Sequence, residues 1–171
     1  MDFNKHAYIL AVIEGLRKQR SWTGKTHVQK TLFLLESAFG LPLPFQFILY
    51  KHGPYSFDVE EELERMKSYE AIRQTAVPAY GVVLQPGELA GFLKKVAPLK
   101  VEEEDAISRV CEFVGTKDVK DLERLATAAW IRKREGVMEN HKIAERLHEL
   151  KPHIPIHEAL RASNEASPLF A

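Results

Sequence analysis

Apolar residues recur at helical spacing along most of the 171-residue chain. Ile9, Val12, Ile13 and Leu16 lie at positions i, i+3, i+4 and i+7, which is the spacing of one buried helix face. A chain with this pattern is expected to be mainly helical. The same spacing predicts further inner faces: Val28, Leu32, Leu35 and Phe39; Leu89, Phe92, Leu93 and Val96; Ile107, Val110, Cys111 and Val114; Leu122, Leu125, Ala126 and Ala129; and Ile143, Leu147 and Leu150.

Small polar residues indicate where several of these helices begin. Thr23 and Thr26 are both candidate N-caps of the second helix, because a hydroxyl can accept from the free N–H groups of a first turn. Ser56 is expected to cap a third helix. Thr116 is expected to cap the helix around Leu125.

In two places the apolar period changes from helical spacing to simple alternation. Phe45, Phe47 and Leu49 alternate with Gln46, Ile48 and Tyr50, which is typical of a strand with at least one buried face. Residues 71–84 contain two short β-prone arms, at 72–75 and 80–84, separated by residues typical of a turn. We expect the second segment to form a hairpin.

The order helix, helix, strand, helix, hairpin is the order of a winged helix. We therefore predict a mainly α fold with a small antiparallel β element, whose N-terminal half resembles a winged helix and is extended by a C-terminal helical layer. The length favours a single domain over residues 1–171. Within it, residues 1–85 form the winged-helix-like core and 86–162 a helical extension packed on that core. A short last helix at 156–162 is followed by a frayed tail, 163–171.

The composition excludes several classes of protein. Hydrophobic residues make up 45% of the chain and charged residues 28%, which is ordinary for a globular protein and unlike a disordered one. Lys and Arg together number 24, equal to Asp and Glu, so no net field attracts nucleic acid or an anionic membrane. Binding of either kind would need a local patch.

No set of residues predicts an enzyme, a metal site or a cofactor site. The single cysteine, Cys111, lies on a predicted core face and is most simply a small buried hydrophobe. His153 and His157 are four residues apart, but Pro155 lies between them and no acidic or cysteine ligand has matching spacing. We expect no catalytic residues, no metal and no cofactor.

The sequence also favours a protein of the cytoplasm. The apolar run from Tyr8 to Ile13 is far shorter than the ~20 residues that a membrane span needs. One cysteine allows no internal disulfide and suits a reducing compartment. We expect no contact with a membrane.

The segment between the predicted strand and the third helix is the least explained by turn chemistry. Gly53, Pro54 and Ser56 serve a turn and a helix cap, whereas Lys51, His52 and Tyr55 serve neither. Loops on rigid scaffolds often carry function, which favours a binding role for these three side chains. The alternative is that Tyr55 packs under the turn and Lys51 is solvated.

Three segments resemble the YwgA-like proteins, an uncharacterised bacterial and archaeal family, and more remotely the Panacea or SocA-type antitoxin domain. They are Lys25 to Lys30, Phe47 to Ser56, and Leu125 to Ala128. The string Gly-Pro-Tyr-Ser, ending at Ser56, is the most specific part of a likeness that covers roughly residues 5–135. His27 stands where the family commonly has Lys or Arg, and the chain after Asn140 matches no part of it. The resemblance implies a winged-helix-like fold and roles in regulation, defence or toxin neutralisation, with no settled catalytic activity.

We therefore predict a non-enzymatic regulatory or antitoxin-like module that binds another protein. Its contacts are expected at Lys30, Lys51, His52 and Tyr55. The sequence does not determine the oligomeric state.

The alternative prediction is a DNA-binding transcription regulator. In a winged helix the third helix enters the major groove, where Lys and Arg neutralise phosphates. Here that helix carries Asp58, Glu60, Glu61, Glu62 and Glu64 against Arg65 and Lys67. Its carboxylates would repel phosphates, so DNA could be contacted only by a basic patch of Lys25, Lys30, Lys51 and Arg73 together with the hairpin.

Overall fold

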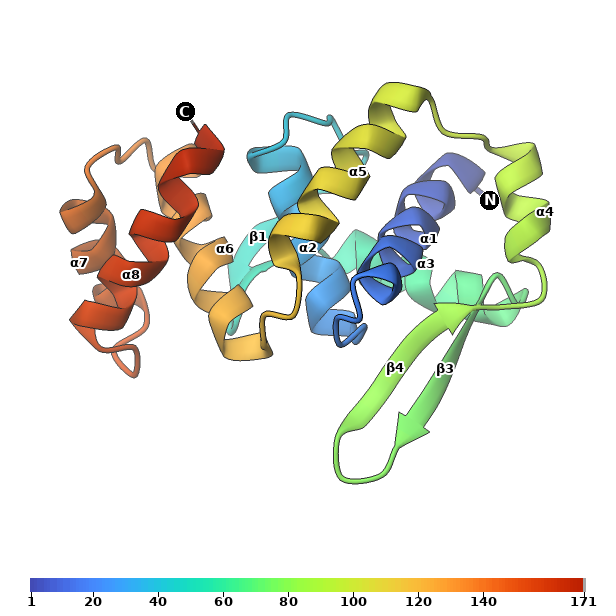
Figure 1. Cartoon of the computed structure of the whole chain (residues 1–171), viewed down its shortest axis with the longest axis horizontal. Coiled ribbons are helices and arrows are strands. Elements are labelled where there is room, and N and C mark those ends of the chain that lie inside the picture. Colours follow the sequence, from blue (N-terminus) through green and yellow to red (C-terminus); the bar gives the residue numbers. More distant parts are fainter. Residues whose placement is uncertain (171) are drawn as a thin grey trace.

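The helices predicted from apolar spacing are all present in the computed structural model, which describes residues 1–170 (Figure 1). The prediction of a mainly helical chain with a small antiparallel β component is confirmed. In chain order the elements are α1 (Phe3–Lys18), α2 (Lys25–Ser37), β1 (Ile48–Tyr50), β2 (Gly53–Tyr55), α3 (Phe57–Ser68), β3 (Ile72–Val77), β4 (Gly81–Pro86), α4 (Ala90–Val96), α5 (Val101–Val114), α6 (Val119–Arg134), α7 (Asn140–Leu150), α8 (Ile156–Ala166) and the 3₁₀ helix η1 (Ser167–Phe170).

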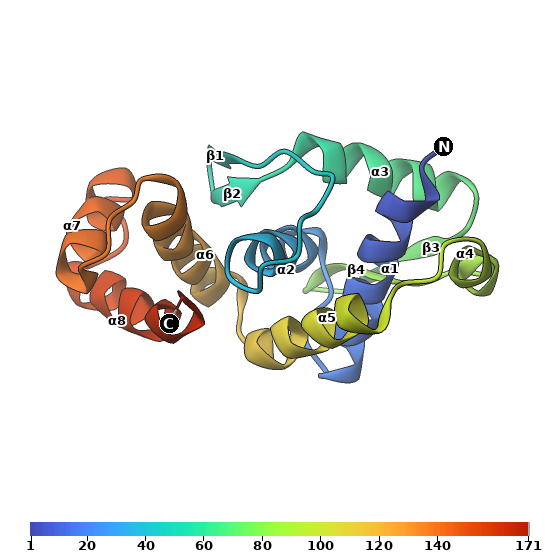
Figure 2. The same cartoon turned by 90° about the horizontal axis from the view of Figure 1, so that it is seen from above.

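Helix α2 lies at the centre of the molecule, with α1, α5, α6 and β2 packed around it (Figure 2). Every residue from His27 to Leu35 is buried. The apolar residues of α2 join a core that also takes in the inner faces of α1, α5 and α6. The polar residues Gln29 and Lys30 are buried as well, so they must find partners inside the protein, because an unpaired buried polar group is costly.

The predicted threonine caps of α2 are wrong. The N-cap is Gly24, which offers no side chain to the first turn. Thr23 lies one residue earlier, and its hydroxyl donates to the carbonyl of Ser21 at 3.1 Å. Thr26 lies within the helix.

Two other predicted helix starts had different outcomes. Ser56 caps α3 as expected, with its Oγ atom 3.3 Å from the backbone nitrogen of Val59. Helix α6 is capped by Asp118, whose side chain accepts from the nitrogen of Asp121 at 2.8 Å, and not by Thr116. A carboxylate is favoured at this position because it also faces the positive end of the helix.

The β3–β4 hairpin is confirmed, with longer arms than predicted. Its strands pair antiparallel from Ile72 opposite Pro86 to Val77 opposite Gly81. The far end of the hairpin projects away from the helices (Figure 1). Its base contacts α3 through β3 and α1 through β4, and the nitrogen of Leu84 donates to the carbonyl of Thr23 at 2.7 Å.

The predicted inner face of α4 is wrong in part. Leu93 is fully buried, but Leu89, Phe92 and Val96 are exposed. Helix α4 has seven residues and lies at one end of the molecule, where it packs on α1 (Figure 1). A helix at this edge buries one side only.

The predicted frayed tail is wrong for residues 163–170. Helix α8 continues to Ala166, and η1 follows it to Phe170. Ser163 and Ala166 are buried. The packing of α8 on α6 and α7 holds this segment, which sequence periodicity alone did not reveal. Ala171 lies outside the described residues.

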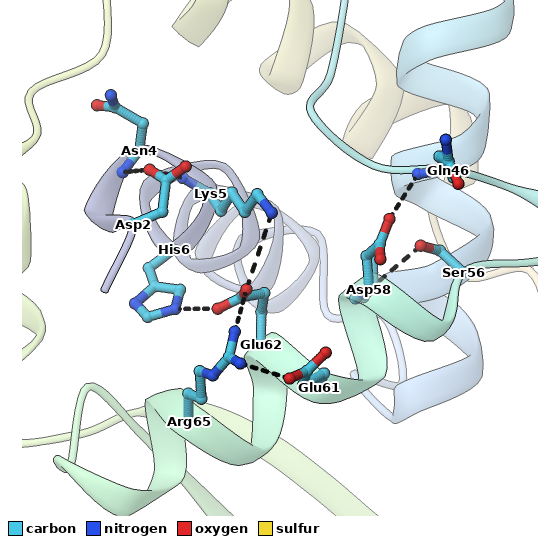
Figure 3. A network of polar contacts seen from close by, with 11 residues as sticks. Asp2, Asn4, Lys5, His6, Gln46, Ser56, Asp58, Glu61, Glu62 and Arg65 are labelled. Carbon is cyan, nitrogen blue, oxygen red and sulfur yellow. Dashed lines mark hydrogen bonds and ion pairs between the residues drawn. The ribbon is translucent and has the colours of Figure 1, made fainter.

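A buried polar contact joins α1 to α3 (Figure 3). The Nε2 atom of His6 lies 2.6 Å from Oε2 of Glu62, and its Nδ1 atom lies 2.8 Å from the hydroxyl of Tyr69. His6 and Glu62 are both buried. Arg65 donates to the second oxygen of Glu62 at 2.7 Å. One carboxylate of the acidic third helix therefore has a structural role inside the fold.

Candidate functional site

The predicted strand is shorter than expected, because β1 begins at Ile48 and not at Phe45. The segment after it forms a second short strand, which the sequence interpretation missed. β1 pairs antiparallel with β2, and Ile48 lies opposite Tyr55. Lys51 and His52 form the connecting turn. Gly53 has a φ of +95°, a conformation that other residues rarely adopt.

This β1–β2 hairpin is fixed to α2 by buried hydrogen bonds from polar residues of that helix. The side-chain amide of Gln29 donates to the carbonyl of Ser56 at 2.8 Å and accepts from the nitrogen of Ser56 at 2.9 Å. Lys30 Nζ donates to the carbonyl of Pro54 at 2.8 Å. The buried polar residues of α2 thus position the junction between β2 and α3.

A cavity of about 230 Å³ lies between the start of α2, the β1–β2 hairpin and α3. We call it the hairpin pocket. Its lining includes Lys25, Lys30, Lys51, His52 and Tyr55, so every predicted partner-binding residue contributes to it. Lys25, Lys30 and Lys51 of the predicted basic patch therefore line the same pocket.

Arg73 lies elsewhere. It belongs to β3, and its guanidinium pairs with Glu88 at 2.7 Å. Lys25 is also paired, with Glu64 at 3.2 Å. Of the four residues predicted for a nucleic-acid backbone, these two already have carboxylate partners within the protein.

Lys30 is the most unusual residue of the pocket. Its side chain is almost wholly buried, with 2% of the residue exposed. Burial lowers the pKa of Lys30 to about 8, with the attraction of Glu123 opposing this shift and the repulsion of Lys151 adding to it. The pKa of Lys30 is therefore close to neutral pH, so its charge responds to small changes in pH.

Glu123 of α6 and Lys151, at the end of α7, are the site residues that sequence reasoning missed. They are 8% and 7% exposed, and Lys151 Nζ lies 3.6 Å from Oε1 of Glu123. Lys151 also donates to the carbonyls of Tyr50 and Lys51 in the hairpin. Both residues are far from Lys30 in the sequence, and each has other charged residues near it that look solvated, so no sequence signal distinguishes them.

Two histidines lie at the exposed edge of Glu123. His52 Nδ1 is 4.0 Å from one carboxylate oxygen, and His153 Nε2 is 3.7 Å from the other. His157 does not take part in these contacts. Among residues 1–170 no group of three or more His, Cys, Asp or Glu side chains is placed to hold a metal ion.

The outer side of the hairpin carries an aromatic cluster of Tyr50, Tyr55 and Phe57. The ring centroids are 5.7 Å apart for Tyr50 and Tyr55, and 5.1 Å apart for Tyr55 and Phe57. Tyr50 is 44% exposed and Phe57 is 53% exposed. Tyr55 is half-buried between them, and Lys51 is exposed with its Nζ 5.9 Å from the centre of the Tyr50 ring. Burial and the neighbouring carboxylate of Glu60 raise the pKa of Tyr55 above its usual range.

His27 does not line the hairpin pocket. Its Nε2 atom lies 2.9 Å from the carbonyl oxygen of Lys117, at the start of α6. Burial lowers the pKa of His27. His27 is therefore a packing residue between α2 and the α5–α6 connection.

A second cavity, of about 340 Å³, lies between α1, α4 and α5. Its lining includes Leu10, Leu93, Ile107 and Cys111. Cys111 is buried, and burial raises the pKa of its thiol to about 12, as expected for an unreactive core cysteine. None of the predicted site residues lines this cavity.

Comparisons with known proteins give no family for the chain, because no family model and no curated protein matches it. The segments Lys25–Lys30, Phe47–Ser56 and Leu125–Ala128 lie on α2, on the β1–β2 hairpin and on α6, and both α2 and β2 pack on α6. No helix among the described residues has the length and apolar character needed to cross a bilayer.

Proposed function

We propose that this chain is a non-enzymatic, winged-helix-like regulatory or antitoxin-like module of a prokaryote that binds another protein through the β1–β2 hairpin. The observation that carries the proposal is the exposed pair Tyr50 and Phe57 beside the hairpin pocket. Aromatic side chains are enriched where binding energy concentrates in protein interfaces, especially next to a pocket that an opposing side chain can fill.

The winged-helix-like description is supported by the order and packing of the N-terminal elements. α1, α2 and α3 are followed by the β3–β4 hairpin, whose base packs on α3. This is the arrangement in which a wing follows the third helix.

A protein partner is favoured over DNA by the charges on the surfaces that would enter or flank the duplex. Helix α3 keeps an excess of carboxylates, even though Glu62 is buried against His6. The projecting hairpin offers a single cation, Arg73, which Glu88 neutralises. DNA affinity comes mainly from free Lys and Arg near phosphates, and these surfaces do not supply them.

The experiment is a pull-down from host lysate with the tagged protein, carried out with and without nuclease. We expect the wild type to retain a stoichiometric protein after nuclease treatment, and the double variant Tyr50→Ala, Phe57→Ala to lose it. The control is Phe92→Ala on α4, because Phe92 is equally exposed at 46% and lies on a different surface. Equal capture by all three proteins would refute the hairpin as the binding surface.

The same pull-down also tests the alternative that the protein binds DNA. Recovery of discrete DNA fragments in place of a protein, with affinity that falls steeply as salt rises, would replace the proposal with a DNA-binding function.

A further inference from the structure

The buried charges beneath the β1–β2 hairpin do not balance. Lys30 and Lys151 place two ammonium groups there, and Glu123 supplies one carboxylate. One ion pair links Glu123 to Lys151, whereas Lys30 forms no ion pair within residues 1–170. Burying a charge raises the free energy of the protein unless another charge or several hydrogen bonds compensate it. The surplus positive charge therefore destabilises the protein when no partner is bound.

Lys30 also has unused hydrogen-bonding capacity. An ammonium group has three N–H donors, and Lys30 makes one hydrogen bond within residues 1–170, to Pro54. The side chain lines the hairpin pocket, which has room for a small group. Burial away from water lowers the pKa of Lys30, and the attraction of Glu123 does not offset that loss of solvation.

We propose that the hairpin pocket receives one carboxylate side chain of the protein partner, with Lys30 as its buried counter-charge. The rings of Tyr50 and Tyr55 then pack against the apolar part of that Asp or Glu. This inference rests on the proposed function, because it places the carboxylate on a protein.

A single carboxylate fits the pocket better than a phosphate. The buried surplus is one positive charge, which one carboxylate neutralises. Glu60 and Leu63 also line the pocket, and an added second negative charge would be repelled by Glu60. The titratable groups around Lys30 are Glu123, Lys151, Lys25, Lys51, His52, Tyr50, Tyr55 and Glu60.

The test uses the full chain and acetate as the probe, followed by NMR through the backbone amide signals of Lys51, His52, Gly53 and Tyr55. Acetate is expected to give saturable shifts in the millimolar range, and acetamide, its neutral counterpart, none. Lys30→Met should abolish the acetate shifts. The control Lys94→Met, at an exposed lysine paired with Glu14, should leave them unchanged.

A measurement on the wild type guards against a structural effect of Lys30→Met. Acetate should bind about tenfold more weakly at pH 9 than at pH 7, because only the protonated fraction of Lys30 attracts it. Equal shifts with acetamide, or an affinity that does not change with pH, would overturn the inference.

The pull-down separates failure of this inference from failure of the proposed function. If Lys30→Met still captures the partner that Tyr50→Ala, Phe57→Ala loses, the hairpin binds a protein without a carboxylate in the pocket, and the inference alone is wrong. If acetate binds through Lys30 but the wild type captures no protein, the pocket belongs to a free small carboxylate, and both proposals are wrong.

Discussion

Gly53 of β2 and Thr127 of α6 approach each other so closely that a Cβ atom on Gly53 would lie 2.8 Å from Oγ1 of Thr127. The hydroxyl of Thr127 is held in place by donating to the carbonyl of Glu123 at 2.6 Å. Because Gly53 also has a φ of +95°, two separate constraints require glycine here. The contact sets how closely the hairpin lies on the helix that carries Glu123.

Gly53→Ala is therefore expected to destabilise the protein by about 2 kcal/mol, through backbone strain and overpacking together. Urea unfolding measures this loss. Gly40→Ala is the matched control, since Gly40 has a φ of +71° with open space around it, and should cost only about 1 kcal/mol. The extra cost at Gly53 should shrink in a Thr127→Ala background, and an undiminished cost there would contradict the steric explanation.

The start of α6 provides a test of the corrected cap. Asp118→Ala should lower the free energy of unfolding by about 1 kcal/mol, because the N–H of Asp121 loses its acceptor. Thr116→Ala should change the stability by less than about 0.5 kcal/mol, as is usual for a surface substitution. Thermal or urea unfolding measures both losses. Equal losses from the two variants would contradict the assignment of Asp118 as the N-cap of α6.

The buried contact between α1 and α3 should be among the most sensitive in the molecule. The two oxygens of Glu62 contact His6 and Arg65, and Glu62→Gln removes the negative charge and replaces one of these acceptors with an N–H donor, so we expect a loss of about 3 kcal/mol. Glu61→Gln is the control, since Glu61 pairs with Arg65 on the exposed side of the same helix. We expect urea unfolding to show a loss at position 62 and almost none at position 61.

The presence of the helices could be predicted from the sequence because each has an apolar face that recurs with the helical period. Leu122 and Ala126 are buried for this reason. The wrong predictions concern features that depend on which other helices and strands pack nearby in the folded protein. The exposed face of α4 at Phe92 and the ordered end of α8 at Ala166 follow from which elements pack against them, and sequence spacing carries no such information.

The site was predictable in its local part only. Lys51, His52 and Tyr55 stood out because turn chemistry did not explain them, and they line one pocket with Lys30. Glu123 joins them because α6 packs on α2 and β2. That association is tertiary, so a solvated and a buried glutamate on α6 look alike in the sequence.

The pH dependence of stability should report the burial of Lys30 directly. Its pKa is about 8 in the folded protein and near its ordinary value of 10.5 in the unfolded chain. Between these values the unfolded chain binds the proton and the folded protein does not, so the free energy of unfolding rises with pH in this window. Below pH 8 both states are protonated, and the cost of burying the charge is present in full.

The slope due to Lys30 can reach about 1.4 kcal/mol per pH unit. Tyr8 and Cys111, whose pKa values are raised to about 12, oppose it at alkaline pH, because their folded forms hold protons longer. Urea unfolding of wild type and Lys30→Met at pH 7, 8, 9 and 10 separates these effects, since Tyr8 and Cys111 are common to both proteins. We expect the stability of the wild type relative to Lys30→Met to increase by about 1 to 3 kcal/mol from pH 8 to pH 10. Lys94→Met should show no such trend, and a constant difference between wild type and Lys30→Met would mean that Lys30 is as well solvated as an exposed lysine.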